Sequence, residues 1–264
     1  MDQMIRRAIT ALTPGDDAEL HVDLAAQRIQ RALLDVTIPS VDTLEIGVHA
    51  EPARLVGGDY IDLHLSGERS LCFAVGDASG KSLAAALTAL MLRYLVRGLV
   101  RALGTANLAD VVGHVNAVVS DDLTDGAFIT FLFGCYDGSD GSTRVVNAGH
   151  EPPLVLRAGA DAVETLDPHG IVLGIDRDAS FAETGCRLGA GDLFVVYTDG
   201  LTEATNKQGE LYTIARLSDD LVANRSLPAA EIAKALFETV RRFSAAEFRD
   251  DATILVMRRV QASH

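Results

Sequence analysis

Five aspartates stand at the ends of short apolar runs or beside a glycine pair: Asp59, Asp77, Asp199, Asp250 and Asp251. Buried carboxylates that cluster need protons or cations to offset their charge. Two Mg²⁺ or Mn²⁺ ions with aspartate and water ligands would satisfy such a cluster. A metal pair of this kind activates water and binds a phosphoryl oxygen. The constellation therefore indicates metal-dependent hydrolysis, although each Asp-Gly step alone is typical of a turn.

Two other chemistries compete with this interpretation. Residues 76–82 read Gly-Asp-Ala-Ser-Gly-Lys-Ser, which is one residue short of the spacing of a nucleotide-binding P-loop. His150 has the chemistry of a general acid or a ligand, but a lone loop histidine is usually structural. No G-x-S-x-G nucleophile motif occurs in the sequence. Metal-dependent hydrolysis remains the best supported of these hypotheses.

Composition narrows the choice of partners. The net charge is −14, from 23 Lys and Arg against 37 Asp and Glu, which disfavours nucleic acid and anionic membranes. The three cysteines, at positions 72, 135 and 186, form no metal or disulfide pattern. The N-terminal residues lack the apolar core of a signal peptide. We expect a cytoplasmic protein without a membrane partner.

The elements that must position the aspartates can be read from periodicity. Alternation over residues 44–48 and apolar runs elsewhere predict strands at 68–76, 127–136, 143–147, 154–157, 193–198 and 252–257. Helices are expected at 83–103, 108–123 and 228–243, the last opened by Pro228. Strands that come in runs, with helices inserted between them, argue for an α+β fold.

Three segments leave alternatives open. The 83–103 helix is long enough to span a membrane, but Arg93, Arg97 and Arg101 predict a charged stripe on a soluble helix. The Gly57-Gly58 pair fits either a bulge that presents carboxylates or a plain hairpin turn. Residues 1–35 contain an amphipathic helix at about 20–35, which either packs on the next domain or dimerises and receives signals.

Together the motifs resemble a known family. They occur in the order Val56–Asp62, Val75–Lys81, Asn147–Pro153, Tyr197–Ala204 and Asp250–Thr253. In this order they are similar to the bacterial PP2C-type serine phosphatases of the SpoIIE/RsbU group. The resemblance covers roughly residues 24–259, and it places a phosphatase domain at 36–260 after an N-terminal helical segment at 1–35.

The resemblance implies an α-β-β-α sandwich, in which two antiparallel sheets are flanked by helices, with two Mn²⁺ or Mg²⁺ ions at one end. Asp77 would bridge both metals, and the Ala78 carbonyl would bind one. Asp199 and Asp250 would complete the shell, with Asp59 as a direct or water-mediated ligand and Asp251 as the ligand if the register shifts by one. Asp77 and Asp199 would act in catalysis through metal-bound water.

Two positions depart from the family's pattern, and a third, Arg54, is expected to match its phosphate ligand. Ser82 replaces a glycine of the family's Gly-Lys-Gly motif and is expected to cap the following helix. Ser79 stands where eukaryotic relatives carry a histidine, so the general acid is unassigned. Arg54 lies five residues before Asp59, a spacing similar to that of the phosphate-contacting arginine of those relatives.

The resemblance also implies a place in sigma-factor regulation and the stress response. The substrate would be phosphoserine or phosphothreonine on a STAS-type anti-sigma-factor antagonist. Because only about 35 residues precede the first strand, we expect control by an activating partner protein or by homodimerisation through the 20–35 helix. The alternative is a catalytically weak phosphatase-like binding module in a partner-switching pathway.

Overall fold

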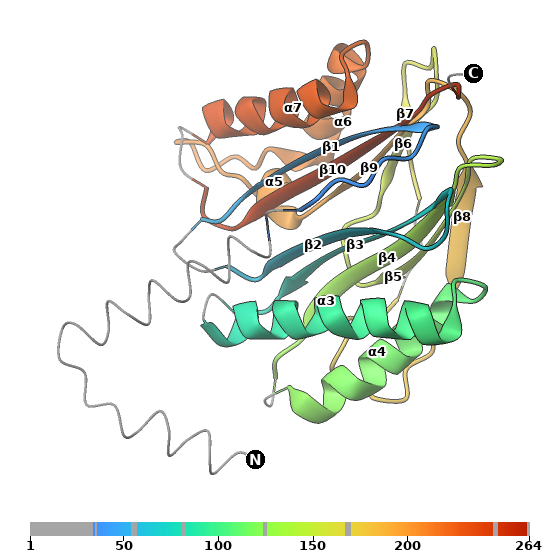
Figure 1. Cartoon of the computed structure of the whole chain (residues 1–264). Helices are drawn as coiled ribbons and strands as arrows, with labels where there is room; N and C mark the ends of the chain where they lie inside the picture. The colour runs from blue at the N-terminus through green and yellow to red at the C-terminus, as the bar shows by residue number, and fades with distance from the viewer. Residues whose placement is uncertain are drawn as a thin grey trace.

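The computed structural model shows two antiparallel five-stranded sheets packed face to face, with helices on the outer face of each sheet (Figure 1). It describes residues 34, 36–53, 57–80, 83–123, 126–166, 170–244 and 248–262. The α+β class and the α-β-β-α layering expected from the sequence are confirmed. The predictions for residues 1–33, for Arg54 and for Ser82 lie outside the described residues.

One sheet has the strand order β2-β3-β4-β5-β8. Its strands are β2 (Asp59–Leu65), β3 (Ser70–Ala78), β4 (Ile129–Asp137), β5 (Ser142–Ala148) and β8 (Glu183–Arg187). The strands β3 and β4 are apolar on both faces because helices cover one face and the second sheet covers the other. The covering helices are α3 (Leu83–Leu103) and α4 (Leu108–Asp122), as the periodicity predicted.

The other sheet has the order β1-β10-β9-β6-β7. Its strands are β1 (Leu44–Glu51), β10 (Ala252–Arg259), β9 (Leu193–Tyr197), β6 (Leu154–Leu156) and β7 (Val163–Thr165). It is covered by α5 (Asp199–Thr202), α6 (Thr213–Asn224) and α7 (Ala229–Phe243). Pro228 is the N-cap of α7 rather than its first helical residue, one position from where the sequence placed it.

Three apolar layers hold the sandwich together. One lies under α3 and α4, one lies under α5, α6 and α7, and the third lies between the two sheets. In the middle layer, Phe73 on β3 and Phe194 on β9 meet edge to face, with ring centroids 5.7 Å apart. Contacts of this kind fix the two sheets against each other and so determine which strand ends share an edge.

The arginines of α3 do not form the solvated stripe that their spacing predicted. The Arg97 guanidinium makes two hydrogen bonds, of 2.8 and 2.6 Å, to the buried Asp62 carboxylate on β2. Arg93 donates to the Ile61 carbonyl at 2.9 Å, and its side chain is only 12% exposed. Arg101 alone of the three is exposed. Among the described helices, none is long and apolar enough to cross a membrane.

Candidate functional site

The predicted aspartates lie at one end of the sandwich, where strands from both sheets begin or end. In the first sheet Asp59 opens β2 and pairs with Asp77 near the end of β3. In the second sheet Asp199 follows β9, and Asp250-Asp251 comes directly before β10. A hydrogen bond of 3.0 Å from the Thr198 amide to the Thr253 carbonyl holds these two segments together.

Asp59 joins the two sheets. Its Oδ2 atom accepts hydrogen bonds from Oγ1 of Thr253 at 2.6 Å and from Oγ1 of Thr198 at 3.0 Å. The Thr253 amide in turn donates to Oγ1 of Thr198 at 2.9 Å. All three residues are buried. The carboxylate therefore has a fixed orientation that neither sheet could impose alone.

The electrostatics at Asp59 favour a bound cation. Burial raises its pKa well above the usual range, and the neighbouring carboxylates of Asp77 and Asp251 raise the pKa further. The hydroxyls of Thr253 and Thr198 only partly offset this effect. A carboxylate in this position requires either a proton or a positive charge nearby.

Gly58 leaves room for two of the predicted ligands. A Cβ atom at this position would lie 2.3 Å from the Ala78 carbonyl oxygen and 2.6 Å from Oδ1 of Asp77. Its backbone carbonyl also accepts the Ala78 amide at 3.1 Å. Two hard oxygen donors therefore face the same small space, which only glycine leaves open.

Asp251 holds the glycine pair in place. Its carboxylate accepts the Gly58 amide at 2.7 Å and the Ala53 amide at 2.8 Å. A Cβ at Gly57 would meet Oδ2 of Asp251 at 1.8 Å. Neither glycine has positive φ, and both precede β2. The hairpin-turn interpretation is wrong, because β1 and β2 belong to different sheets. Close approach to carboxylates explains the glycines.

Asp199 and Asp250 complete the set. Asp199 is the first residue of the short α5, and Gly200 beside it packs against the backbone of Asp251, where a Cβ would lie 1.9 Å from the carbonyl oxygen. Oδ1 of Asp250 accepts the Asp251 amide at 2.9 Å. The turn before β10 and the start of α5 are thus held against each other.

Glu151 is an acidic neighbour that the sequence analysis did not single out. Burial raises its pKa, and the charges of Asp199 and Glu203 raise it further. Oε2 of Glu151 accepts a hydrogen bond of 3.4 Å from the Tyr197 hydroxyl. The only sequence signal was that Glu151 and Glu203 lie inside two of the family motifs.

His150 contacts strand β4 next to the candidate site. Its Nδ1 atom lies 3.0 Å from Oγ1 of Thr130, the residue opposite Asp77 across the β3–β4 ladder. The Asn147 side chain donates a hydrogen bond to the His150 carbonyl and accepts one from the His150 amide. Burial lowers the pKa of His150 to about 4, so the ring is neutral at pH 7 and carries no acidic proton to donate. The structural interpretation of this histidine is favoured.

The donor set suits hard divalent cations. Its members are carboxylates and one backbone carbonyl, the ligands that Mg²⁺ and Mn²⁺ prefer. Among the described residues, no three His, Cys, Asp or Glu side chains are gathered tightly enough to hold one ion directly. Waters in the coordination shell, which Mg²⁺ retains readily, would bridge such gaps. The residues therefore fit a hydrated metal centre.

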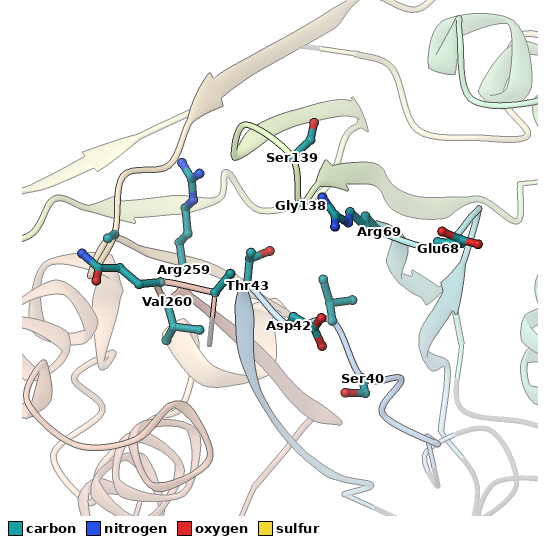
Figure 2. A pocket seen from close by; sticks show the side chains of 13 residues that line it. Ser40, Asp42, Thr43, Glu68, Arg69, Gly138, Ser139, Arg259 and Val260 are labelled. Atoms are coloured by element: carbon teal, nitrogen blue, oxygen red, sulfur yellow. The ribbon is translucent and has the colours of Figure 1, made fainter. Parts of the chain in front are cut away.

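A cavity of about 570 Å³ lies at the opposite end of the strands from the aspartates. Figure 2 shows its lining, which includes Thr43, Arg69, Ser139 and Arg259. Nη1 of Arg259 donates to the Asp140 carbonyl at 2.9 Å. The cavity mixes acidic and basic side chains and contains none of the predicted ligands. The convergent carboxylates, rather than this cavity, therefore define the candidate site.

Comparison with known proteins places the sequence among phosphatases. The model of the family "Stage II sporulation protein E (SpoIIE)" matches residues 67–260. Phosphoserine phosphatase RsbU of Bacillus subtilis is 27% identical over 241 residues, which is 90% of this chain and 70% of RsbU. Protein IcfG of Synechocystis is 28% identical over 225 residues, 76% of this chain but only 35% of IcfG.

Solved structures share the fold. The RsbU and RsbW domains of Rv1364c from Mycobacterium tuberculosis match with a TM-score of 0.76 and 25% identity, over 88% of this chain and 64% of that one. The SiaA-PP2C domain of Pseudomonas aeruginosa matches with a TM-score of 0.77 and 22% identity, over 92% and 96%. The catalytic domain of the phosphatase PstP, solved with two manganese ions, matches with a TM-score of 0.59 and 18% identity, over 83% and 99%.

Proposed function

Because the chain belongs to the SpoIIE family of PP2C-type phosphatases, we propose that it hydrolyses phosphoserine or phosphothreonine on a regulatory protein. Its enzyme class is phosphoprotein phosphatase. The observation that carries the proposal is the space at Gly58, where Oδ1 of Asp77 and the Ala78 carbonyl converge. Beside this space lies Asp59, a desolvated carboxylate that requires positive charge.

The residues have distinct roles in this proposal. Asp77, the Ala78 carbonyl, Asp199 and Asp250 present oxygens to two divalent cations, Mn²⁺ or Mg²⁺. Asp59 adds a further ligand, either direct or through water, and the hydroxyls of Thr198 and Thr253 orient it. Asp251 acts differently, because its carboxylate already accepts two backbone amides that fix the Gly57-Gly58 segment. We therefore assign Asp250 as the ligand and Asp251 as a positioning residue.

When bound, the cations supply a water of lowered pKa and positive charge beside the phosphoryl oxygens. The protein buries the Asp59 carboxylate and half-buries Asp77, Asp199 and Asp250 at this edge of the sheets, where electrostatic interactions are stronger than in water. His150 keeps a neutral ring against Thr130 and so fixes the strand position opposite Asp77. The proton for the leaving serine or threonine oxygen has no assigned donor among these side chains.

The name of the relative RsbU, a phosphoserine phosphatase, supports a regulatory phosphoprotein as substrate. We propose a phosphorylated STAS-type anti-sigma-factor antagonist as that substrate, within a partner-switching pathway in the cytoplasm. The matching Rv1364c structure holds an RsbU domain and an RsbW domain, which supports a partner-switching role. In such a pathway the family resemblance implies an anti-sigma kinase as a further component. The substrate is tested separately from the chemistry. The protein is incubated with such a phosphoprotein and with its Ser-phosphorylated peptide, and mass spectrometry measures the loss of phosphate from each.

The chemistry is tested by p-nitrophenyl phosphate hydrolysis in EDTA, Mg²⁺ or Mn²⁺. Asp77→Asn should lower turnover by several orders of magnitude and leave the fold intact, because it would remove a charged oxygen donor from the proposed cation site. The matched control is Asp121→Asn. It removes an exposed carboxylate of α4 that forms an ion pair with Arg177. Metal-dependent turnover that survives in Asp77→Asn would contradict the proposal. No turnover and no Mn²⁺ binding in the wild type would support the phosphatase-like binding module instead.

A further inference from the structure

Two cysteines far apart in sequence are direct neighbours in the fold. Cys72 on β3 and Cys135 on β4 face each other across the β3–β4 ladder. Their Sγ atoms lie 2.8 Å apart, and both thiols are free and buried. Directly opposed residues of an antiparallel pair have Cα atoms about 4.5–5.5 Å apart. This distance lies within the range that a disulfide spans, about 4.4–6.8 Å.

A charged side chain stands beside this pair. His64 on β2 is the register partner of Cys72, and its Nδ1 atom lies 3.4 Å from Oδ2 of Asp62. Burial alone would lower the pKa of His64, but its interactions with Asp62 and Cys72 raise it to about 9. The pKa of the Cys72 thiol is lowered, first by the hydrogen bond from Cys135 and then by His64. The buried cluster therefore favours a thiolate, the reactive form of cysteine.

A cavity lies beside the second cysteine. A polar cavity of about 270 Å³ is lined by Cys135 together with Ser70, Thr105, Asp137 and Arg144. A cavity of this size admits several water-sized molecules. Hydrogen peroxide is scarcely larger than water, whereas a protein thiol or a bulky disulfide would not enter.

We propose that Cys72 and Cys135 are a redox modification site, where a small hydroperoxide oxidises the two thiols to a reversible intramolecular disulfide. The geometry carries this proposal: two sulfurs 2.8 Å apart, a polar cavity lined by the residue Cys135, and a histidine opposite Cys72. None of these groups belongs to the proposed metal centre, so the site is independent of the phosphatase chemistry.

The reaction balances in two steps. The thiolate resides on Cys72, because Cys135 donates the hydrogen bond between them and the pKa of Cys135 is raised. The Cys72 thiolate attacks an oxygen of the hydroperoxide: an S–O bond forms, the O–O bond breaks, and the leaving oxygen takes the Cys135 proton. The Cys135 thiolate then attacks the sulfenic sulfur of Cys72, an S–S bond forms, the S–O bond breaks, and the departing hydroxide takes a proton from solvent to leave as water. The two cysteines lose two electrons, and the hydroperoxide gains them.

A disulfide at this place would be easy to reduce. Opposed Cβ atoms on neighbouring strands are about 4.5–5.5 Å apart, whereas disulfides prefer about 3.8 Å. The strands must approach each other for the bond to form. Strained disulfides have more oxidising potentials and are the labile or regulatory ones. A cellular dithiol would therefore reverse the modification.

The experiment counts thiols in the full-length protein before and after hydrogen peroxide, by alkylation under denaturing conditions and mass spectrometry. The wild type should lose two of its three thiols, with a Cys72–Cys135 peptide cross-link that dithiothreitol removes. Cys186→Ser is the matched control, since Cys186 lies on the edge strand β8, and it should lose both remaining thiols. Cys72→Ser and Cys135→Ser should form no intramolecular bond.

Two results would overturn the proposal. One is a wild type in which all three thiols survive, and the other is oxidation at Cys186 with Cys72 and Cys135 still reduced. Cys72→Ala and Cys135→Ala provide a second pair of variants, without a buried hydroxyl, and thermal unfolding of each confirms that it is folded. A cross-link that persists in either folded alanine variant would also contradict the assignment.

Discussion

Oδ2 of Asp59, at the start of β2, accepts a hydrogen bond of 2.6 Å from the Thr253 hydroxyl on β10. The two residues belong to different sheets and are 194 positions apart in the chain. This bond fixes a desolvated carboxylate beside Asp77, its partner across the β2–β3 ladder. The closure of the sandwich and the assembly of the candidate metal centre therefore depend on the same contact.

The raised pKa of Asp59 predicts how stability depends on pH without metal. Since the folded state binds this proton more tightly than the unfolded state, the contribution is complete below about pH 4. It is lost as the pH rises through the folded pKa, by up to about 1.4 kcal/mol per pH unit in that window. Asp59→Asn in EDTA should therefore lose less stability than the wild type as the pH rises above about 4. Urea unfolding at several pH values measures this, and parallel curves for the two proteins would contradict it.

Divalent cations should reduce the loss of wild-type stability at higher pH, because they replace the proton at Asp59. Ligand at one hundred times its dissociation constant stabilises the folded state by about 2.7 kcal/mol, which for a protein of this size is a rise in Tm of about 5–10 °C. We expect Mn²⁺ to raise the Tm of the wild type more at pH 8 than at pH 5, because protons compete with the cation for Asp59 and its neighbours. Differential scanning calorimetry measures both shifts, and Asp121→Asn should respond like the wild type.

Gly58→Ala should strongly lower turnover and also reduce stability, because a clash with a backbone oxygen is not relieved by rotating a side chain. The new Cβ would lie 2.3 Å from the Ala78 carbonyl oxygen and 2.6 Å from Oδ1 of Asp77, so these two proposed ligands must move apart. We expect turnover to fall at least about a hundredfold, consistent with small displacements of positioned groups. The matched control is Gly113→Ala on α4, where a Cβ meets nothing within 4 Å. That change should preserve activity and stabilise the helix by about 0.5–1 kcal/mol. Equal activities in the two variants would refute the role of Gly58.

Arg97→Ala should destabilise the protein although Arg97 lies on a helix surface. The change leaves the buried Asp62 carboxylate without its two-bond partner. Losing hydrogen bonds to a charged group costs about 1.5–3 kcal/mol, and the lower end is expected because the Arg97 side chain is 39% exposed. Arg101→Ala, an exposed change on the same helix, should shift stability by less than about 0.5 kcal/mol. Urea unfolding of both variants decides the matter, and equal losses would show that Asp62 does not depend on Arg97.

Removal of residues 1–35 tests the predicted role of the N-terminal helix. We expect the shortened chain to be a smaller oligomer than the full chain in light scattering, with altered phosphatase activity. The physical reason is the amphipathic pattern of residues 20–35, which requires an apolar partner. Unchanged oligomeric state and activity would refute regulation through this segment.

The sequence by itself determined the layers and the position of the chemistry along the chain. Continuous apolar runs such as that of β4 and the period of α3 depend on neighbours within a few residues, so they could be read locally. Asp77 and Asp199 could be placed at strand ends for the same reason. Only the close packing of carboxylates explained Gly57 and Gly58, which a local reading could not separate from a turn.

The tertiary structure alone decided which side chains meet. Strand register pairs Cys72 with Cys135, and it places Asp62 beneath Arg97 rather than among the metal ligands. Sheet-on-sheet packing brings Thr198 and Thr253 to Asp59. These contacts join positions 35 to 194 residues apart. Local propensity carries no information about such pairs, because burial of the three apolar layers sets register and stacking for the whole chain at once.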